Sequence, residues 1–246
     1  MNLQQPRNWA RLMVWKLLTL ARVALKKNGF EIRRVLGSSS NPTSQIRHEI
    51  LSHCPGILHV GAHIGQEAPL YDDIGLNVIW IEGDPAIYSE LKAQIQSRVN
   101  QRAFLALLGN RAEENTNFYR ASNNGQSSSV YPLAKDLKFN YVTQVDTVRL
   151  NMQTLDALFS DETLQGYPYW LLDVQGAELL VLQGAQANLD YCEFLELEVS
   201  NFFHYESQPL FEELTTFLAK NGFFPIWKPS ERFHGNVLYL RTPRQK

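Results

Sequence analysis

The sequence predicts one α/β domain built on a mostly parallel, seven-stranded sheet, with helices on both faces, a C-terminal antiparallel hairpin and an N-terminal helical extension. Short apolar runs alternate with segments of helical length, which is typical of parallel strands joined by right-handed crossovers. A turn flanked by Gly61 and Gly65 joins one such run to a helix. The last two apolar runs, 223–227 and 237–240, are too close together for a helix between them, and this spacing predicts the hairpin.

The elements follow in order from these runs and from the residues that interrupt them. Turn-forming residues at 37–42 separate the extension from the domain, and Thr43 or Ser44 can cap a short helix that ends near His53. The stretch 115–156 is less regular and holds a polar loop at 123–129, for which a plain surface loop is the simplest interpretation. Strands are expected near 57–61, 78–82, 103–108, 169–174, 193–199, 223–228 and 236–241, and helices near 65–74, 85–97, 177–188 and 209–221.

Residues 1–42 are interpreted as a basic amphipathic extension and linker ahead of the domain at 43–246. Residues 1–35 hold eight Lys and Arg and one Glu, a charge of +7 in a chain whose total is −2, so the rest carries −9. A helix over residues 7–34 has an imperfect apolar face, and its apolar run is too short to predict a transmembrane span. We expect this helix to dock on the domain or to form a homodimer, with peripheral contact to an anionic membrane as the alternative.

Composition indicates an ordinary globular protein. The hydrophobic share of 44% and the charged share of 20% are typical of a folded domain. The two cysteines, Cys54 and Cys192, are too few for a disulfide framework. Since no secretory cleavage pattern follows the first apolar stretch, a cytoplasmic protein is expected, membrane-associated if the extension binds lipid.

The segment 57–85 predicts a pocket for a nucleotide-containing cofactor. Its first strand ends at Gly61, and glycine lets a backbone turn pass close to a ligand because it has no Cβ. The next strand ends in Glu82, about 20 residues after the glycine turn, where an acid can bind both ribose hydroxyls. Dinucleotide folds prefer G-x-G-x-x-G around a pyrophosphate, whereas this chain has G-x-x-x-G. The looser turn favours S-adenosylmethionine, which has no phosphate; a strand–helix turn that binds nothing is the structural alternative.

Five segments in a fixed order resemble the FkbM-type family of S-adenosylmethionine-dependent methyltransferases. They are VGAHIGQE, VIWIEGDP, NNGQSSSVYP, LLDVQGAELLVLQGA and FLELEVS, spread over roughly 57–240. The resemblance implies the class I methyltransferase (Rossmann-like) sheet, and members that mostly methylate hydroxyl groups of sugars and other natural products. It also raises the alternative that loop 123–129 closes over the cofactor or acceptor. Two positions depart from the family pattern K-I-D-V-E-G, where Leu171 replaces the lysine and Gln175 the first glutamate.

Candidate site residues follow from the rule that ligands bind at the carboxyl ends of parallel strands. Gly61 and Gly65 are expected to admit the methionine part of the cofactor, Glu82 to hold the ribose, and Leu107 or Leu108 to pack on adenine. Asp173 is the candidate polar group near the reacting methyl. The expected cofactor-binding residues are Gly61, Ala62, His63, Gly65, Glu82, Asp84, Leu107, Leu108 and Asp173.

Methyl transfer to an alcohol requires in-line approach and removal of the hydroxyl proton. We name Asp173, Glu198 and His204 as the catalytic candidates; His63 is a further candidate base, and Glu178 fits a helix start as well as catalysis. A set of oxygens from Asp173, Glu198 and Asn201 could hold Mg²⁺, but nothing in their spacing requires it, and no metal is predicted.

The absence of some motifs narrows the function further. The chain has no G-x-x-x-x-G-K-[ST] loop and no G-x-S-x-G elbow, which argues against P-loop nucleotidases and serine hydrolases. The acidic domain argues against a nucleic-acid partner. The sequence therefore predicts an O-methyltransferase that acts on a small-molecule or glycan acceptor. An NAD(P)-dependent oxidoreductase and a catalytically degenerate, methyltransferase-like binding protein remain as alternatives.

Overall fold

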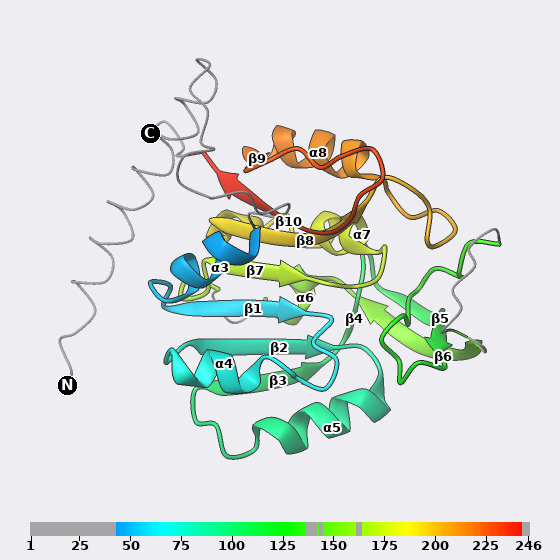
Figure 1. Cartoon of the computed structure of the whole chain (residues 1–246). Helices are drawn as coiled ribbons and strands as arrows, with labels where there is room; N and C mark the ends of the chain where they lie inside the picture. The colour runs from blue at the N-terminus through cyan, green and yellow to red at the C-terminus, as the bar shows by residue number, and fades with distance from the viewer. Residues whose placement is uncertain (1–42, 136–141, 143–144, 161–163, 243–246) are drawn as a thin grey trace.

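The computed structural model describes residues 43–135, 142, 145–160 and 164–242. Over these residues the main sheet has seven strands in the order β3-β2-β1-β7-β8-β10-β9 (Figure 1). The strands from β3 to β8 pair in parallel, and β10 pairs antiparallel with both β8 and β9. The predicted fold class and its C-terminal hairpin are therefore confirmed. The strands are β1 Gly56–Val60, β2 Asn77–Glu82, β3 Gln101–Leu105, β7 Tyr169–Leu172, β8 Phe194–Ser200, β9 Phe223–Pro225 and β10 His234–Arg241.

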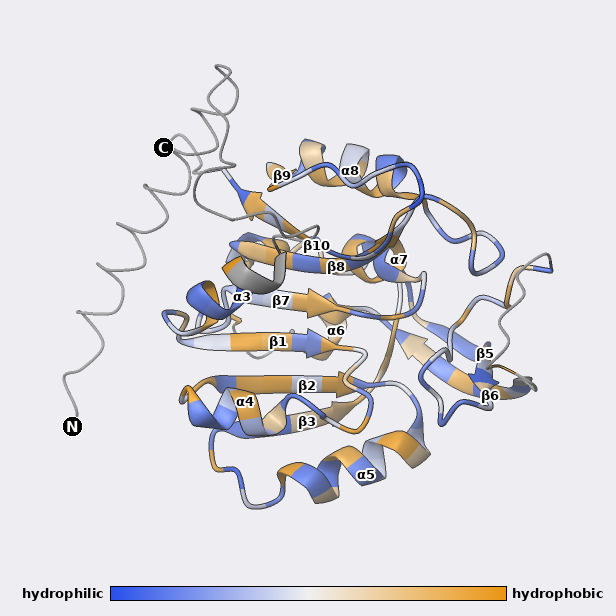
Figure 2. Ribbon diagram, viewed as in Figure 1, coloured by the Kyte–Doolittle hydropathy of each residue, from blue (hydrophilic) through white to orange (hydrophobic). Residues whose placement is uncertain are grey.

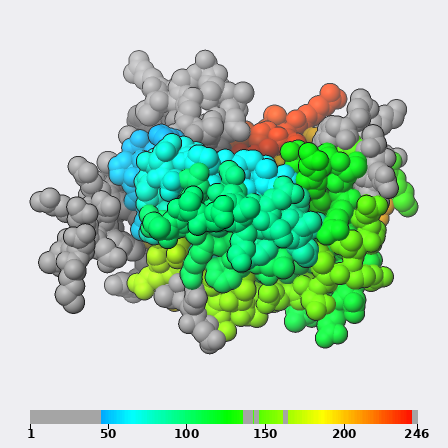
Figure 3. All heavy atoms as spheres, turned by 90° about the horizontal axis from the view of Figure 1, so that it is seen from below, coloured from blue at the N-terminus to red at the C-terminus, as the bar shows by residue number. Residues whose placement is uncertain are grey.

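Helices pack on both faces of this sheet through two separate apolar cores. On one face, α3 (Thr43–Leu51), α4 (Ala68–Asp73) and α5 (Pro85–Ile95) contribute to a core that includes Tyr71 and Trp80. On the other face, α6 (Leu155–Leu158), α7 (Glu178–Gln183) and α8 (Phe211–Lys220) pack with the short turn η1 (Leu189–Tyr191). From below, atoms of the chain from β1 to α5 cover the middle of the surface (Figure 3).

The residue types explain why these segments adopt these elements. The β2 run Val78–Ile81 is β-branched and aromatic and fully buried, as expected for a central strand covered on both faces. Figure 2 shows the hydrophobic strands at the centre of the molecule, against an α5 that mixes hydrophobic and hydrophilic residues. That helix begins where Asp84 accepts a hydrogen bond from the Ala86 amide at 2.9 Å, directly before Pro85.

A second, three-stranded sheet lies largely within the stretch 115–156, for which no strand was predicted. Its order is β4-β6-β5, from β4 Leu107–Leu108, β5 Glu113–Ala121 and β6 Val145–Gln153. The single strand predicted near 103–108 is therefore wrong, because the chain leaves the main sheet after Leu105 and enters the small sheet at Leu107. A small core of Leu107, Phe118 and Met152 holds this sheet together.

Helix bounds differ from the predictions mainly at the ends. The helix predicted from 65 starts at Ala68, since Gly65 to Glu67 form the turn before it, and the one predicted for 177–188 ends at Gln183. The extension at 1–42, with the predicted helix over 7–34, lies outside the described residues. Among the helices that the structure describes, none is long and apolar enough to cross a membrane.

Candidate functional site

A cavity of about 590 Å³ opens at the carboxyl ends of the parallel strands. Gly61 follows β1, Glu82 ends β2 and Leu107 begins β4, while Asp173 follows β7 and Glu198 lies near the end of β8. All five line this cavity. Residues more than 130 positions apart in the sequence therefore lie around one cavity, as expected for the carboxyl ends of parallel strands.

The turn after β1 has a stereochemical need for its glycines. Gly61 has φ of +77°, and a Cβ there would lie 1.9 Å from the Asp173 carbonyl oxygen. Gly65 also has φ of +77°, but it does not line the cavity, and its Cβ would meet Leu91 Cδ1 at 2.7 Å. Ala62 lines the cavity and donates its backbone N–H to Ile81. Gly61 thus brings β1 and β7 together under the cavity, whereas Gly65 lets the turn pack on α5.

Glu82 holds the first turn in place. One carboxylate oxygen accepts the His63 backbone N–H at 2.9 Å and the other accepts the Asp84 N–H at 2.8 Å. Burial raises the pKa of Glu82, and the two backbone hydrogen bonds oppose that rise. A carboxylate has about four acceptor positions, so these backbone contacts leave about two of them unused.

Asp84 lines the cavity but serves two structural contacts. Besides capping α5, its carboxylate binds Arg120 of β5 through two nitrogens, at 2.5 and 2.7 Å. Leu107 and Leu108, which were expected at the adenine, both line the cavity from β4.

Three carboxylates meet where β7, α7 and β8 approach the cavity. Asp173, Glu178 and Glu198 each have a carboxylate oxygen within 4.8 Å of the others. Burial is the main cause that raises the pKa of all three, and like charges add to it, bringing Glu178 to about 8. A hydrogen bond between Asp173 and Glu198 lowers the pKa of Asp173 and raises that of Glu198.

Glu178 has a structural task at the turn before α7. Its Oε1 accepts the backbone N–H groups of Val174 at 3.1 Å and Gly176 at 3.3 Å, closing the turn that leads into α7. Asn201, the third oxygen considered for Mg²⁺, does not line the cavity, and its amide nitrogen donates to the Ser230 carbonyl.

Histidine placement differs from the expectation. His204 is buried beside the cluster, outside the lining of the main cavity, and burial lowers its pKa to about 4. Its ring packs on His234, with centroids 4.1 Å apart. His234 itself lines the cavity, with Nε2 3.4 Å from Glu198 Oε1, and was not anticipated. Burial lowers the pKa of His234 as well. The register between β8 and β10 explains this placement: Asn236 lies opposite Glu198, so His234 is the diagonal neighbour of Glu198.

Loop 123–129 forms a wall of the cavity, so the plain surface loop is wrong. Asn123 and Gly125 to Ser129 line the cavity. The ring nitrogen Nε2 of His63 lies 2.7 Å from the Asn124 carbonyl, and the Tyr205 hydroxyl oxygen lies 3.2 Å from the Ser127 carbonyl oxygen. These contacts tie the loop to the first turn and to the chain after β8.

The residues present fit S-adenosylmethionine. The turn 61–65 places no lysine or arginine in the cavity that could bind a phosphate. Glu82 offers hydrogen-bond acceptors there, and Leu107 and Leu108 form an apolar wall. Asp173 lines the same cavity. Leu171, one of the two departures from the family pattern, is buried in the core on the α3–α5 face and does not line the cavity.

The comparison with protein families agrees with this geometry. Residues 59–225 match the family described as the methyltransferase FkbM domain, which is more than half of the chain. No curated protein matches the chain.

Solved structures show a distant likeness on which we base no assignment. The 1,6-didemethyltoxoflavin-N1-methyltransferase of Burkholderia thailandensis, with S-adenosylhomocysteine bound, is 14% identical over 99% of this chain and 93% of that chain, with a TM-score of 0.43. A putative caffeoyl-CoA O-methyltransferase from Staphylococcus aureus is 9% identical over 92% of this chain and 100% of that chain, with a TM-score of 0.46. EvdMO1 is 12% identical over 80% of this chain, with a TM-score of 0.42, and this chain spans only 39% of its length.

Proposed function

Because the chain belongs to the FkbM family of S-adenosylmethionine-dependent methyltransferases, we propose that it methylates a hydroxyl group of a sugar, a glycan or another hydroxylated natural product. One observation carries this proposal: the carboxyl groups of Asp173 and Glu198 lie together in the cavity, where the Gln175 amide donates a hydrogen bond to each of them. Acceptor deprotonation needs such a base within reach of the reacting oxygen.

The cavity walls suit a polyhydroxylated acceptor. Beyond the cofactor residues, the lining is polar and includes Ser127, Ser128 and Ser129 of the loop, Gln175, and His234 at the start of β10. Hydroxyl, amide and imidazole groups both donate and accept hydrogen bonds, as sugar hydroxyls do. Their spread over three chain segments favours recognition of several hydroxyls at once.

The chemistry follows from these positions. The bound cofactor supplies a sulfonium methyl group that an acceptor oxygen attacks in line, with S-adenosylhomocysteine as the other product. The cavity walls hold the acceptor hydroxyl towards that methyl, which is where much of the rate enhancement arises. Asp173 would accept the hydroxyl proton as the new C–O bond forms and the bond between the methyl carbon and the cofactor sulfur breaks.

The first test is cofactor binding. Calorimetric titration with S-adenosylhomocysteine should show binding, and titration with NAD should show none. Binding of NAD would instead favour the oxidoreductase alternative. Turnover of a hydroxylated acceptor then separates an enzyme from a catalytically degenerate binding protein, the alternative that Gln175 supports.

Asp173→Asn tests the role of the charge. Its turnover should fall by about 10²–10⁴-fold, the usual scale for general acid–base catalysis, with little change in cofactor affinity. Asp73→Asn, an exposed site on α4, is the matched control. If Asp173→Asn loses thermal stability but keeps its turnover per folded molecule, Asp173 is only structural, and the proton passes to Glu198 or His204.

A further inference from the structure

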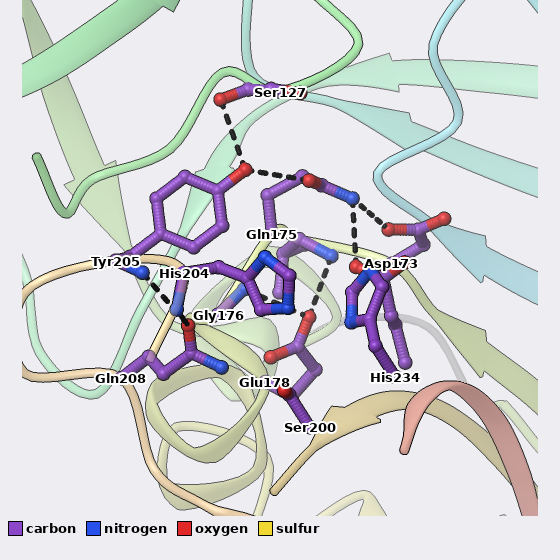
Figure 4. A network of polar contacts seen from close by, with 12 residues as sticks. Ser127, Asp173, Gln175, Gly176, Glu178, Ser200, His204, Tyr205, Gln208 and His234 are labelled. Carbon is purple, nitrogen blue, oxygen red and sulfur yellow. Dashed lines mark hydrogen bonds and ion pairs between the residues drawn. The ribbon is translucent and has the colours of Figure 1, made fainter. Parts of the chain in front are cut away.

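Gln175 lies where two loops meet the carboxylate cluster (Figure 4). Its amide nitrogen donates to Asp173 Oδ1 at 2.6 Å and to Glu198 Oε2 at 2.9 Å. Its side-chain oxygen accepts from the Tyr205 hydroxyl at 2.7 Å, and its backbone oxygen accepts from the Ser129 hydroxyl at 2.7 Å. A primary amide has two N–H donors, so both are used to hold the two carboxylates.

The backbone at Gln175 is strained in a way that serves this contact. Its φ is +54°, a left-handed conformation that is uncommon outside glycine. Such strain persists only where the surroundings over-determine it, and it gathers at functional sites. Here Glu178 binds the amides of Val174 and Gly176 on either side of Gln175, which fixes the turn.

A glutamate at this position would behave differently. A carboxylate can accept from Tyr205 but can donate to Asp173 or Glu198 only when it is protonated. It would otherwise add a like charge to a buried group of carboxylates, which disfavours ionisation of all of them. The neutral amide therefore bridges the pair without requiring a second proton.

We propose that Gln175 is a positioning residue for methyl transfer, which holds Asp173 and Glu198 as one proton-sharing pair and keeps Asp173 free to accept the hydroxyl proton. This inference rests on the proposed function. Gln175 acts through the two carboxylates and links them to loop 123–129 through Ser129. Other titratable groups face the pair and remain unchanged in the variants below: Glu67, Glu178, Glu196, Tyr205 and His234.

The first experiment follows thermal stability against pH and needs no acceptor. In Gln175→Glu, the added carboxyl has a folded-state pKa above its unfolded value of about 4.3, because carboxylates surround it. The folded state then binds more protons than the unfolded state, so stability falls as pH rises through that window. The melting temperature of the variant should fall further below that of the parent at pH 8 than at pH 5.

Gln94→Glu, which adds the same charge at an exposed site on α5, is the matched control and should show no such trend. A constant difference between Gln175→Glu and the parent across pH 5–8 would overturn the bridging role.

The second experiment measures turnover. Gln175→Glu should move the rising limb of the pH–rate profile to higher pH by about one unit or more, because the added negative charge raises the pKa of Asp173. Gln175→Leu, which has neither donor nor added charge, should lose about 10-fold or more in turnover while its affinity for S-adenosylhomocysteine changes less than about 3-fold. An unshifted profile in Gln175→Glu, or parental turnover in Gln175→Leu, would remove Gln175 from the reaction.

The two proposals fail in different ways. If the parent protein methylates no hydroxylated acceptor, the proposed function fails, yet the pH trend of Gln175→Glu still tests the bridge. If the parent is active and both Gln175 variants match it, only the present inference fails.

Discussion

Replacing Glu82 with alanine should weaken S-adenosylhomocysteine binding by about 1–3 kcal/mol, the cost of leaving ribose hydroxyls without their charged acceptor. That corresponds to about a 5- to 150-fold rise in Kd. The two acceptor positions that Glu82 keeps open towards the cavity are the source of this energy. Calorimetry on purified parent and variant measures it directly.

The same change should also lower stability, which a strand-end acid alone would not predict. Without Glu82, the backbone N–H groups of His63 and Asp84 lose their acceptor, at a cost of about 1–3 kcal/mol for each group that water cannot reach. A domain of this size loses about 2–4 °C in melting temperature per kcal/mol. A drop of several degrees is therefore expected, although the variant should still fold.

A ligand without the ribose hydroxyls separates the two effects. The parent should bind such an analogue of S-adenosylhomocysteine more weakly than the full ligand, whereas Glu82→Ala should bind both alike. If the analogue loses as much affinity on the variant as on the parent, Glu82 does not contact the ribose. Equal affinity of parent and variant for the full ligand would lead to the same conclusion.

Three further predictions concern the residues around the site. Gly61→Ala should abolish folding or lower the free energy of unfolding, measured by urea titration, by more than about 4 kcal/mol, because its Cβ would lie 1.9 Å from the Asp173 carbonyl oxygen. The control Gly75→Ala, with φ of +69° and no atom within 4 Å, should cost about 1–2 kcal/mol. Similar losses in both variants would show that the close contact at Gly61 does not determine the cost. Glu178→Gln keeps an acceptor for the amides of Val174 and Gly176 and removes a carboxyl group whose pKa is raised to about 8. In the parent, the stability that protonated Glu178 contributes is lost as pH rises from about 4.5 to 8. The melting temperature of the variant should therefore vary less over that range, and an identical pH dependence in both proteins would contradict the raised pKa. Deleting residues 1–42 should leave a domain that binds S-adenosylhomocysteine, and co-sedimentation of the full chain with anionic but not neutral vesicles would support membrane contact; equally poor binding to both would favour docking or a dimer.

The sequence predicted the main sheet because its strands are unambiguous. Runs such as Val78–Ile81 are apolar, buried on both faces and followed by polar residues at the ligand edge. The small sheet was missed for the opposite reason. Most residues of β5, Glu113–Ala121, are only partly buried, and β4 has just two residues, so neither gives a strong apolar pattern.

The site was predictable in its strand-end carboxylates but not in their partners. Asp173 and Glu198 follow from the rule for parallel strands, and both line the cavity. His234 comes from an antiparallel strand, where that rule does not apply, and only the register with β8 brings it near Glu198. Gln175 was noticed as a departure in charge, while its left-handed backbone and paired donors depend on contacts that no local pattern encodes.

The two sheets carry different parts of the site. Asp173, Gln175 and Glu198 are held by the main sheet, whereas the adjoining wall at 123–129 extends from β5 of the small sheet. Mutations in β5 and loop 123–129 can therefore reshape that wall while the carboxylates keep their supports, provided that the Ser129 hydroxyl keeps its contact with the Gln175 backbone oxygen. Changes in this wall are therefore a natural starting point for altering which molecules the cavity admits.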